Sequence, residues 1–334
     1  MIEILSSTDL ASIQDIGRDN YLRYGVGTAG AMDQIALMAG NIFLKNPENV
    51  AAIEIPIFPF QVKFLEDIVF SLTGADTNAE IDGESIPPYW VRRARKNQLL
   101  TLSAPRYGAR AYLGLAGGID VPIVLGSRST HLRGEFGGYQ GRTLRQGDVL
   151  RPMASGHLDT NDPMIMDVGF GAEPPQYALP LGDAAFPTKT FVRVLPAAEY
   201  DSYEEDSINS FWSTDWKITG QSDRYGYRLA GEAMIPKQVM ELRSHGIVPG
   251  VIQVPHNGQP IIQLRDAQPS GGYPKFGTVI EADLWRLGQA RPGTQLRFLK
   301  VSYEEALQAS HAVRNYLHKL RHLSELYGLS LLRS

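Results

Sequence analysis

Residues 249–264 read PGVIQVPHNGQPIIQL, two short apolar runs joined by a His-Asn-Gly-Gln turn. Runs of this length that are rich in Val and Ile are typical of β-strands. An Asn-Gly pair between two such runs is a strong local signal for a β-hairpin, because both residues accept the positive backbone φ angles that a tight hairpin turn needs. The stretch therefore predicts an antiparallel strand pair in the second half of the chain.

The same alternation of apolar runs and turn residues extends over most of the 334 residues. Between residues 153 and 190, however, Ala, Gly, Pro and Asp follow one another without periodicity, and such text does not build a packed core. We therefore expect a mainly β protein with two β-barrel domains, at residues 1–152 and 191–302, joined by an irregular connection at 153–190. The clearest strand runs in the first half are residues 53–60, 68–73, 99–102 and 110–116.

Two segments show helical periodicity instead, with apolar residues spaced by three and four. The first segment is residues 31–44, and the second is a C-terminal helix at 303–328. Ser302 and Glu305 form a capping box at the start of the second helix. We expect the second helix to dock on its own domain, and the alternative is that it binds a partner. The apolar positions are Ile35, Met38, Ala39 and Ile42 in the first helix, and Ala306, Ala309, Val313, Leu317 and Leu320 in the second.

The composition is that of a soluble globular protein, with 43% hydrophobic and 20% charged residues. Lys and Arg total 32 against 36 Asp and Glu, without long blocks of one sign, so we expect no nucleic-acid partner. The chain has no cysteine, which excludes disulfides and thiolate chemistry. Neither a leader peptide nor a membrane-spanning run is recognisable, so we expect a cytoplasmic protein without a membrane partner.

Residues 25–30, GVGTAG, fit the glycine pattern of a dinucleotide-binding loop and precede the expected first helix. Such a loop needs an apolar strand directly before it, but residues 19–24 read DNYLRY, and no βαβ alternation follows. We interpret the segment as a glycine turn and a helix start, where backbone N–H groups favour an anion and Asp33 complements the helix dipole.

Signatures of several other chemistries are missing from the sequence. There is no G-x-S-x-G nucleophile elbow, and no G-x-x-x-x-G-K-[ST] loop through which this chain itself would bind ATP. His318 and His322 have the spacing of a chelating pair on a helix, but no third ligand stands beside them. We therefore predict no metal site.

The densest group of polar residues follows the predicted hairpin. Asp266, Ser270, Tyr273 and Lys275 lie in a Gly- and Pro-rich loop, a place where a rigid barrel commonly displays functional groups. Together with other polar residues they predict a barrel mouth that binds a small amide or carboxylate. Those further candidates are Arg224, Gln253, Gln289 and Arg128, the last in a GSRST string that holds an anion or forms a solvated turn.

Read in order, segments across about 290 residues resemble one family, the biotin-dependent carboxyltransferase or allophanate hydrolase subunit 2 family, which includes KipA-like proteins and 5-oxoprolinase subunits. In the first half the segments are QDIGR (14–18), GAMD (30–33), AIEI (52–55), TGAD (73–76), YLGLAGGI (112–119), DVP (120–122), LGSRST (125–130) and GD (147–148). In the second half they are SDRYGYRL (222–229), GVIQVPHNGQPI (250–261) and GGYPKFGTVIEADL (271–284).

The resemblance implies cyclophilin-like β-barrels and a polypeptide that works only with other chains. A member of the 5-oxoprolinase type is the C subunit of a complex that also contains a KipI-like B subunit and an A subunit. That complex uses ATP to hydrolyse 5-oxoproline to L-glutamate. For such a reaction we expect Asp266, Lys275 and Tyr273 to be catalytic. Residues expected to bind the substrate are Arg224, Gln253, Gln289, Ser270 and Arg128.

Two alternatives stay open at this point, because a fold does not select a function. One is a carboxyltransferase subunit that acts on urea or a related amide. The chain has no biotinyl-lysine sequence, so biotin would then be carried by another protein. The other is a KipA-like regulator that binds a KipI-type inhibitor of a kinase.

Overall fold

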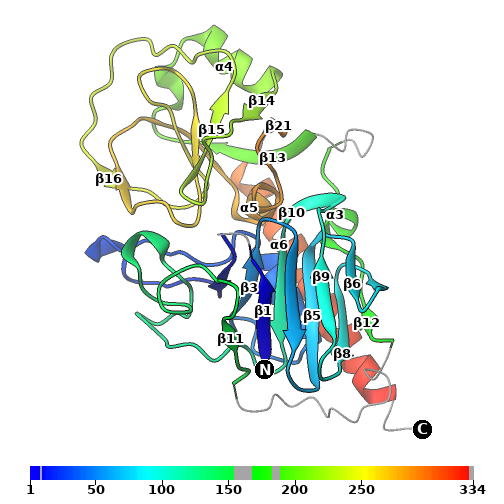
Figure 1. Ribbon diagram of the computed structural model, residues 1–334. Helices are drawn as coiled ribbons and strands as arrows, with labels where there is room; N and C mark the ends of the chain where they lie inside the picture. Colours follow the sequence, from blue (N-terminus) through cyan, green and yellow to red (C-terminus); the bar gives the residue numbers. More distant parts are fainter. Residues whose placement is uncertain (8–9, 154–167, 183–188, 331–334) are drawn as a thin grey trace. The chain divides into compact units, whose positions relative to one another are not determined.

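The computed structural model describes residues 1–7, 10–153, 168–182 and 189–330 (Figure 1). The chain forms two compact units. The first comprises Met1–Arg18, Ala29–Ala178 and Arg314–Ser334, and the second comprises Asp19–Thr28 and Leu179–Val313. These ranges differ from the contiguous domains that we expected, because a ten-residue piece near the N-terminus belongs to the second unit and the C-terminal helix is divided between the units.

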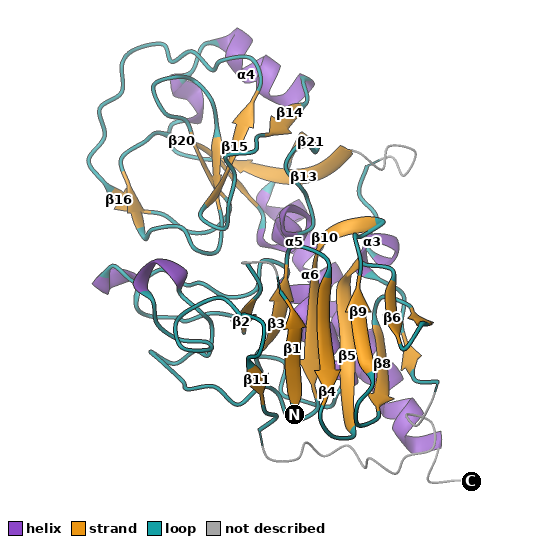
Figure 2. Ribbon diagram, viewed as in Figure 1, coloured by secondary structure: helices purple, strands orange, loops and turns teal. Residues whose placement is uncertain are grey.

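The first unit contains two six-stranded sheets, whose strands appear in orange in Figure 2. One sheet has the order β11-β1-β4-β9-β6-β7, and the other has the order β12-β8-β5-β10-β3-β2. The strands of the one sheet are β1 (Ile2–Ser6), β4 (Phe60–Phe64), β6 (Ala79–Ile81), β7 (Glu84–Ile86), β9 (Leu99–Leu102) and β11 (Val149–Leu150). Those of the other are β2 (Ser12–Gln14), β3 (Ala52–Ile55), β5 (Ile68–Asp76), β8 (Trp90–Ala94), β10 (Tyr107–Leu115) and β12 (Phe170–Gly171).

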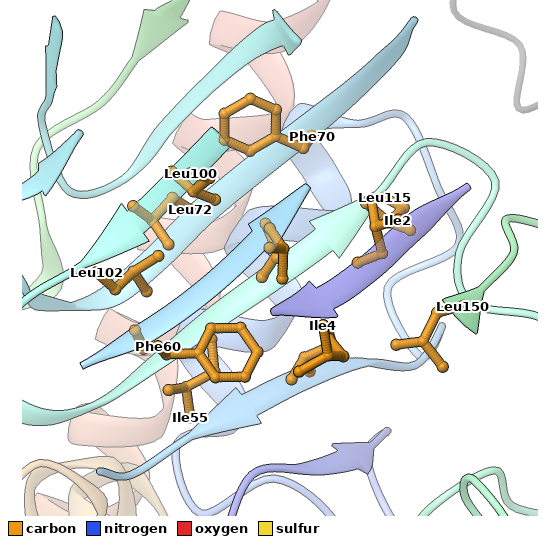
Figure 3. Close-up of a cluster of buried hydrophobic side chains, with 14 of the residues drawn as sticks. Ile2, Ile4, Ile55, Phe60, Phe70, Leu72, Leu100, Leu102, Leu115 and Leu150 are labelled. Carbon is orange, nitrogen blue, oxygen red and sulfur yellow. The ribbon is translucent and has the colours of Figure 1, made fainter. Parts of the chain in front are cut away.

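The hydrophobic core of this unit draws side chains from both sheets (Figure 3). Ile4, Phe60 and Leu100 from one sheet belong to the same buried cluster as Phe70 and Leu115 from the other. Packing two sheets face to face buries the apolar side of each, which is the arrangement of a β-sandwich.

The expected barrel in this half is therefore wrong in one respect, although the mainly β class is confirmed. Among the described residues, strand pairing leaves each of the two sheets open at both ends of its strand order, whereas we expected a barrel. The strands β5 and β10 are buried along almost their whole length rather than at alternate residues, which means that both faces of their sheet are covered. The short helix α1 (Gln34–Phe43) packs against β5 and β10 and covers the face of this sheet that does not pack on the other sheet.

Residues 153–190, expected as an irregular connection, lie partly outside the described residues. Within the described part, Phe170 and Gly171 of β12 pair with β8, and α3 (Pro175–Ala178) belongs to the first unit. Two 3-10 turns complete the minor elements of the first half, η1 (Leu22–Tyr24) and η2 (Leu132–Gly134).

The second unit contains a closed seven-stranded barrel, which confirms the expectation for this half of the chain. The order around the barrel is β13-β20-β17-β18-β15-β14-β21. Its strands are β13 (Lys189–Pro196), β14 (Trp216–Ile218), β15 (Gly226–Ala230), β17 (Val251–Gln253), β18 (Ile261–Gln263), β20 (Lys275–Val279) and β21 (Gln295–Lys300). Outside the barrel lie the strand pair β16 (His245–Gly246) and β19 (Ser270–Gly271), and the helical elements η3 (Tyr200–Ser202), α4 (Glu205–Ser213), η4 (Glu281–Asp283) and α5 (Leu284–Gly288).

The predicted hairpin is present as β17 and β18, with Ile252 opposite Ile262. At its turn, Gly258 has a φ of 72°, a conformation that glycine adopts without a steric penalty. An aromatic cluster joins α4 to the barrel strands β20 and β21. The ring of Phe211 on α4 lies 4.4 Å from that of Phe276 and 4.5 Å from that of Phe298, centroid to centroid.

The C-terminal helix α6 (Tyr303–Ser330) begins as expected. The Ser302 N–H donates to Glu305 Oε2 at 2.7 Å, and the Glu305 N–H donates to Ser302 Oγ at 3.2 Å, which confirms the capping box. Ala306 and Ala309 pack on Ile280 and Ala282 in the second unit. In the first-unit part of the helix, Tyr316 Oη donates to the Glu173 carbonyl at 2.8 Å. The apolar face is thus covered by the protein's own chain.

Candidate functional site

The strongest polar contact among the predicted site residues joins Arg224 to Asp266. Arg224 precedes β15 and Asp266 follows β18. Nε and Nη2 of the guanidinium donate to the two carboxylate oxygens at 2.8 and 3.0 Å. Both side chains are nearly enclosed, with exposed fractions of 11% for Arg224 and 4% for Asp266. The backbone supports this geometry, because the Asp266 N–H donates to the Arg224 carbonyl at 3.0 Å. Such a two-pronged pair fixes the plane of the guanidinium.

A second group consists of Gln253, Tyr273 and Lys275. Gln253 is opposite Lys275 in the pairing of β17 with β20. Its Nε2 donates to the Tyr273 carbonyl at 3.3 Å, and its Oε1 accepts from Gln263 Nε2 at 3.0 Å. Gln253 is buried, so these contacts occupy one donor and one acceptor position of its amide. Tyr273 is 43% exposed, and its ring meets that of His256 edge to face.

Two residues that the sequence did not single out surround Lys275. Its Nζ contacts Nε2 of the exposed His245, and its backbone N–H donates to Glu199 Oε2 at 2.9 Å. Burial lowers the pKa of Lys275 below its ordinary value, because a desolvated ammonium is disfavoured, and the Glu199 carboxylate opposes this shift. Glu199 lies 76 residues before Lys275, so no local sequence signal connects the two.

The strand register separates the two groups along the barrel wall. Lys275 and Ile261 both lie opposite Gln253, so Lys275 is level with the start of β18. Asp266, in contrast, comes three residues after the end of that strand. Gln263 connects the two groups, since its side chain bonds to Gln253 while its backbone pairs with Gly226, two residues after Arg224. We did not predict a role for Gln263 from the sequence.

The other three predicted residues stand apart from these contacts. Gln289 follows α5, and its N–H bonds to the Trp285 and Arg286 carbonyls. Ser270 is exposed in β19, opposite Gly246. Arg128 belongs to the first unit, whereas the other seven predicted residues belong to the second. The Nε of Arg128 donates to the Val121 carbonyl at 3.1 Å.

Two negative findings bear on the chemistry. Within the described ranges, no three or more His, Cys, Asp or Glu side chains gather as metal ligands do. In the same ranges, no helix combines the length and apolar character needed to cross a membrane. The polar groups that the second unit brings together at the predicted positions are the Arg224–Asp266 pair, the Gln253 amide and the Lys275 ammonium.

Comparison with known proteins identifies the family of the chain. The model of the family described as "Carboxyltransferase domain, subdomain A and B" matches residues 24–300, which is most of the chain. The chain belongs to this carboxyltransferase family. The match spans parts of both units, so it concerns the whole architecture and not the barrel alone.

Relatives within the family differ in how much other polypeptide they carry. The C subunit of the Haemophilus influenzae 5-oxoprolinase is 38% identical over 323 residues, which cover 97% of this chain and 98% of that protein. The urea amidolyase of Saccharomyces cerevisiae is 32% identical over 316 residues, covering 91% of this chain but 17% of that protein. The solved urea carboxylase of Kluyveromyces lactis superposes with a TM-score of 0.83 at 27% identity, over 97% of this chain and 29% of that one.

Two segments that carry the family resemblance, QDIGR and LGSRST, meet in the first unit. One oxygen of the buried Asp15 carboxylate accepts hydrogen bonds from Ser127 Oγ at 2.7 Å, Ser129 Oγ at 2.5 Å and the Gly17 N–H at 2.8 Å. The other oxygen accepts from the Arg128 N–H at 2.6 Å. The two serine hydroxyls therefore donate to the protein's own carboxylate and are buried, so they form neither of the two alternatives that the sequence left open, a bound-anion site or a solvated turn.

The start of α1 is likewise occupied from within the chain. Glu54, which is 1% exposed, accepts from the Met32 N–H at 2.8 Å and from Tyr112 Oη at 2.7 Å. Tyr112 Oη in turn accepts from the Asp33 N–H at 2.8 Å, and Asp33 caps the helix through the Ala36 N–H. The expected anion at this helix start is thus the side chain of Glu54. Sequence alone had no signal for it, because Glu54 lies in a strand 22 residues beyond Met32.

Proposed function

We propose that this chain is the C subunit of a 5-oxoprolinase and works with a KipI-like B subunit and an A subunit to hydrolyse 5-oxoproline to L-glutamate, using ATP. The observation that carries the proposal is the end-to-end match to the 5-oxoprolinase C subunits of H. influenzae and Escherichia coli, of which 98% and 97% are covered. The match to these C subunits takes in both units, whereas the match to the yeast urea amidolyase covers 17% of that protein.

The chemistry of a lactam explains why cations and amides suit this role. A lactam is a resonance-stabilised amide, so its carbonyl must be activated before water can open the ring near neutral pH. Phosphorylation of the carbonyl oxygen by ATP supplies such activation. We assign no ATP site to this chain, because it has no P-loop. Both the 5-oxoproline carboxylate and a phosphoryl group are anionic, so preorganised cations stabilise the charge that develops on them.

We assign the following roles to the second unit. Arg224 binds the substrate carboxylate, and Asp266 holds the guanidinium in the required plane. Lys275 supplies a second cation, which stabilises charge on the activated carbonyl. The amides of Gln253 and Gln289 and the hydroxyls of Tyr273 and Ser270 hydrogen-bond the lactam group. Arg128 lies in the first unit and receives no role in this group.

The direct test is reconstitution with B-type and A-type subunits from the same organism. Glutamate formation from 5-oxoproline, dependent on ATP and on all three polypeptides, is the expected result. Omitting this chain should abolish turnover. An assembled complex that consumes no 5-oxoproline would contradict the proposal.

A second candidate function is carboxyl transfer to urea or a related amide, with biotin carried by another protein. The 32% identity to the yeast urea amidolyase over 91% of this chain favours it. The same purified complex, given urea and a carboxybiotin-loaded carrier domain, distinguishes the candidates. Carboxylation of urea without any 5-oxoproline hydrolysis would support the second candidate and reject the first.

Lys275 offers a prediction about pH. Lys275→Met in the assembled complex should lower kcat/KM for 5-oxoproline on the order of 10²-fold, because the methionine keeps the stem but removes the cation. The pKa of Lys275 is lowered, so in the wild type the ammonium is lost at a lower pH than that of an exposed lysine. Activity should therefore fall on the alkaline side through this lowered pKa.

Lys275→Arg is the matched control, because a guanidinium stays charged across this range. Its alkaline loss of activity should move to higher pH even if its maximum is reduced. The measurement is kcat/KM from about pH 6 to about pH 11, a range that extends past the ordinary lysine pKa of about 10.4. Identical alkaline limbs in the wild type and Lys275→Arg would show that the Lys275 ammonium does not act in the reaction.

A further inference from the structure

The glycine-rich segment near the N-terminus is the one sequence motif that the proposed site does not use, and the structure gives it an unexpected location. Residues Asp19–Thr28 belong to the second unit, although they lie far from it in the sequence. The contacts of this segment reach the residues after β18, where Asp266 lies. Thr28 Oγ1 donates to the Arg265 carbonyl at 3.3 Å, across 237 residues of sequence.

Gly27 approaches the same residues even more closely. It is buried, and a Cβ placed on it would lie 2.8 Å from the Ala267 carbonyl oxygen and 3.9 Å from that of Asp266. Real Cβ atoms essentially never come within 3.0 Å of a backbone oxygen, so only glycine permits this approach. The Gly27 φ angle is not in the left-handed region, which means that the side chain is excluded by space and not by backbone strain.

These contacts are made to the residues next to Asp266 in the chain. The carbonyls on either side of Asp266, those of Arg265 and Ala267, are the two that the segment touches. The Asp266 N–H bonds to the Arg224 carbonyl at 3.0 Å, and the Ala267 N–H bonds to the Leu264 carbonyl at 3.0 Å. Movement of the backbone at residue 267 is therefore transmitted to the carboxylate that orients the guanidinium.

We propose that Gly27 and Thr28 are positioning residues, which hold the 265–267 backbone in place and thereby set the orientation of the Arg224 guanidinium toward an anionic substrate group. The identity of that substrate group rests on the proposed function. The contact between residues 27–28 and residues 265–267 does not depend on it. A segment remote in sequence thus controls affinity for the substrate. Enzyme sites require groups to be held within about 0.5 Å of the productive geometry, so a displacement of a few tenths of an ångström matters.

The first experiment measures the contact without reference to activity. In Gly27→Ala, hydrogen exchange at the Asp266 and Ala267 amides should accelerate at least about tenfold, because the new Cβ must displace the Ala267 carbonyl. The Met234 amide, which bonds to the Gly258 carbonyl elsewhere in the unit, should be unchanged. Gly220→Ala is the matched control, since a Cβ at Gly220 meets nothing within 4 Å.

The second experiment uses the reconstituted complex with 5-oxoproline and ATP. Gly27→Ala should raise KM for 5-oxoproline about tenfold with little change in kcat, the signature of weakened substrate binding. Thr28→Val, which loses only the hydroxyl, should raise KM about threefold, and Thr28→Ser should restore it. Mere loss of folded protein would lower the maximal rate and leave KM unaltered.

The outcomes separate the two claims. Unchanged exchange at residues 266 and 267 in Gly27→Ala overturns the inference, and so does accelerated exchange with an unchanged KM. If the wild-type complex hydrolyses no 5-oxoproline, the proposed function fails. Accelerated exchange confined to residues 266 and 267 would still support the contact with residues 265–267.

Discussion

Replacing Asp266 with alanine is expected to lower the free energy of unfolding of the second unit by about 3–5 kcal/mol, because it leaves the Arg224 guanidinium largely buried without its carboxylate. Three of the four tryptophans, Trp212, Trp216 and Trp285, lie in this unit, so tryptophan fluorescence during denaturant unfolding reports mainly on it. The same variant should lower kcat/KM for 5-oxoproline on the order of 10²-fold in the assembled complex, since the guanidinium loses its orientation.

A double variant separates these two effects. Arg224→Met with Asp266→Leu removes both charges and keeps apolar volume, and such replacements of buried ion pairs are often neutral for stability. We therefore expect near-wild-type unfolding but no recovery of turnover. Equal unfolding midpoints for the wild type and Asp266→Ala would show that the pair does not stabilise the barrel, and recovered turnover in the double variant would exclude Arg224 from substrate binding.

Glu54→Ala should cost the first unit a comparable amount, about 3–5 kcal/mol. The change removes the acceptor for the Met32 N–H and for Tyr112 Oη, and the carboxylate whose Oε1 lies 3.7 Å from Arg110 Nε. All of these groups are buried, so water does not replace the lost partner without opening the unit. Hydrogen exchange at the amides of α1 measures the effect where it is expected.

Two milder variants serve as controls. Glu54→Gln keeps an acceptor oxygen and should cost less than Glu54→Ala. Tyr112→Phe removes the hydroxyl that links Glu54 to the Asp33 N–H and should cost about 1–2 kcal/mol. Burial, followed by the carboxylates of Glu54 and Asp33, holds the pKa of Tyr112 well above its ordinary value, so the phenol stays a donor near neutral pH. Glu54→Ala and Tyr112→Phe each break the hydrogen bond between Tyr112 Oη and Glu54. The stability lost in the Glu54→Ala/Tyr112→Phe double variant should therefore be smaller than the sum of the losses in the two single variants. Full additivity would contradict the coupling.

The local elements were predictable from the sequence because their causes are local. The β17–β18 hairpin follows from an Asn-Gly turn between two apolar runs, and the start of α6 follows from a serine and a glutamate three residues apart. The family could be assigned from the order of short segments across the chain, and the match over residues 24–300 confirms it.

The candidate site was predictable in part. The sequence placed Arg224 and Asp266 in one polar group, and the structure joins them in an ion pair. The surroundings of Lys275 were not predictable, since Glu199 and His245 reach it across 76 and 30 residues of sequence. The serine hydroxyls of LGSRST resembled an anion site until the structure brought Asp15 against them from 112 and 114 residues away.

Local sequence patterns were enough to predict the mainly β character, the hairpin, the two amphipathic helices and the family, because periodicity, turn chemistry and caps act between near neighbours. They could not predict that the described strands of the first unit form an open pair of sheets while those of the second close into a barrel, or that residues 19–28 join the second unit. Those outcomes depend on which faces and edges meet over separations of up to 237 residues. The need for glycine at position 27 cannot be predicted from the neighbouring sequence, because the carbonyl that leaves no room for a side chain belongs to Ala267, 240 residues further along the chain.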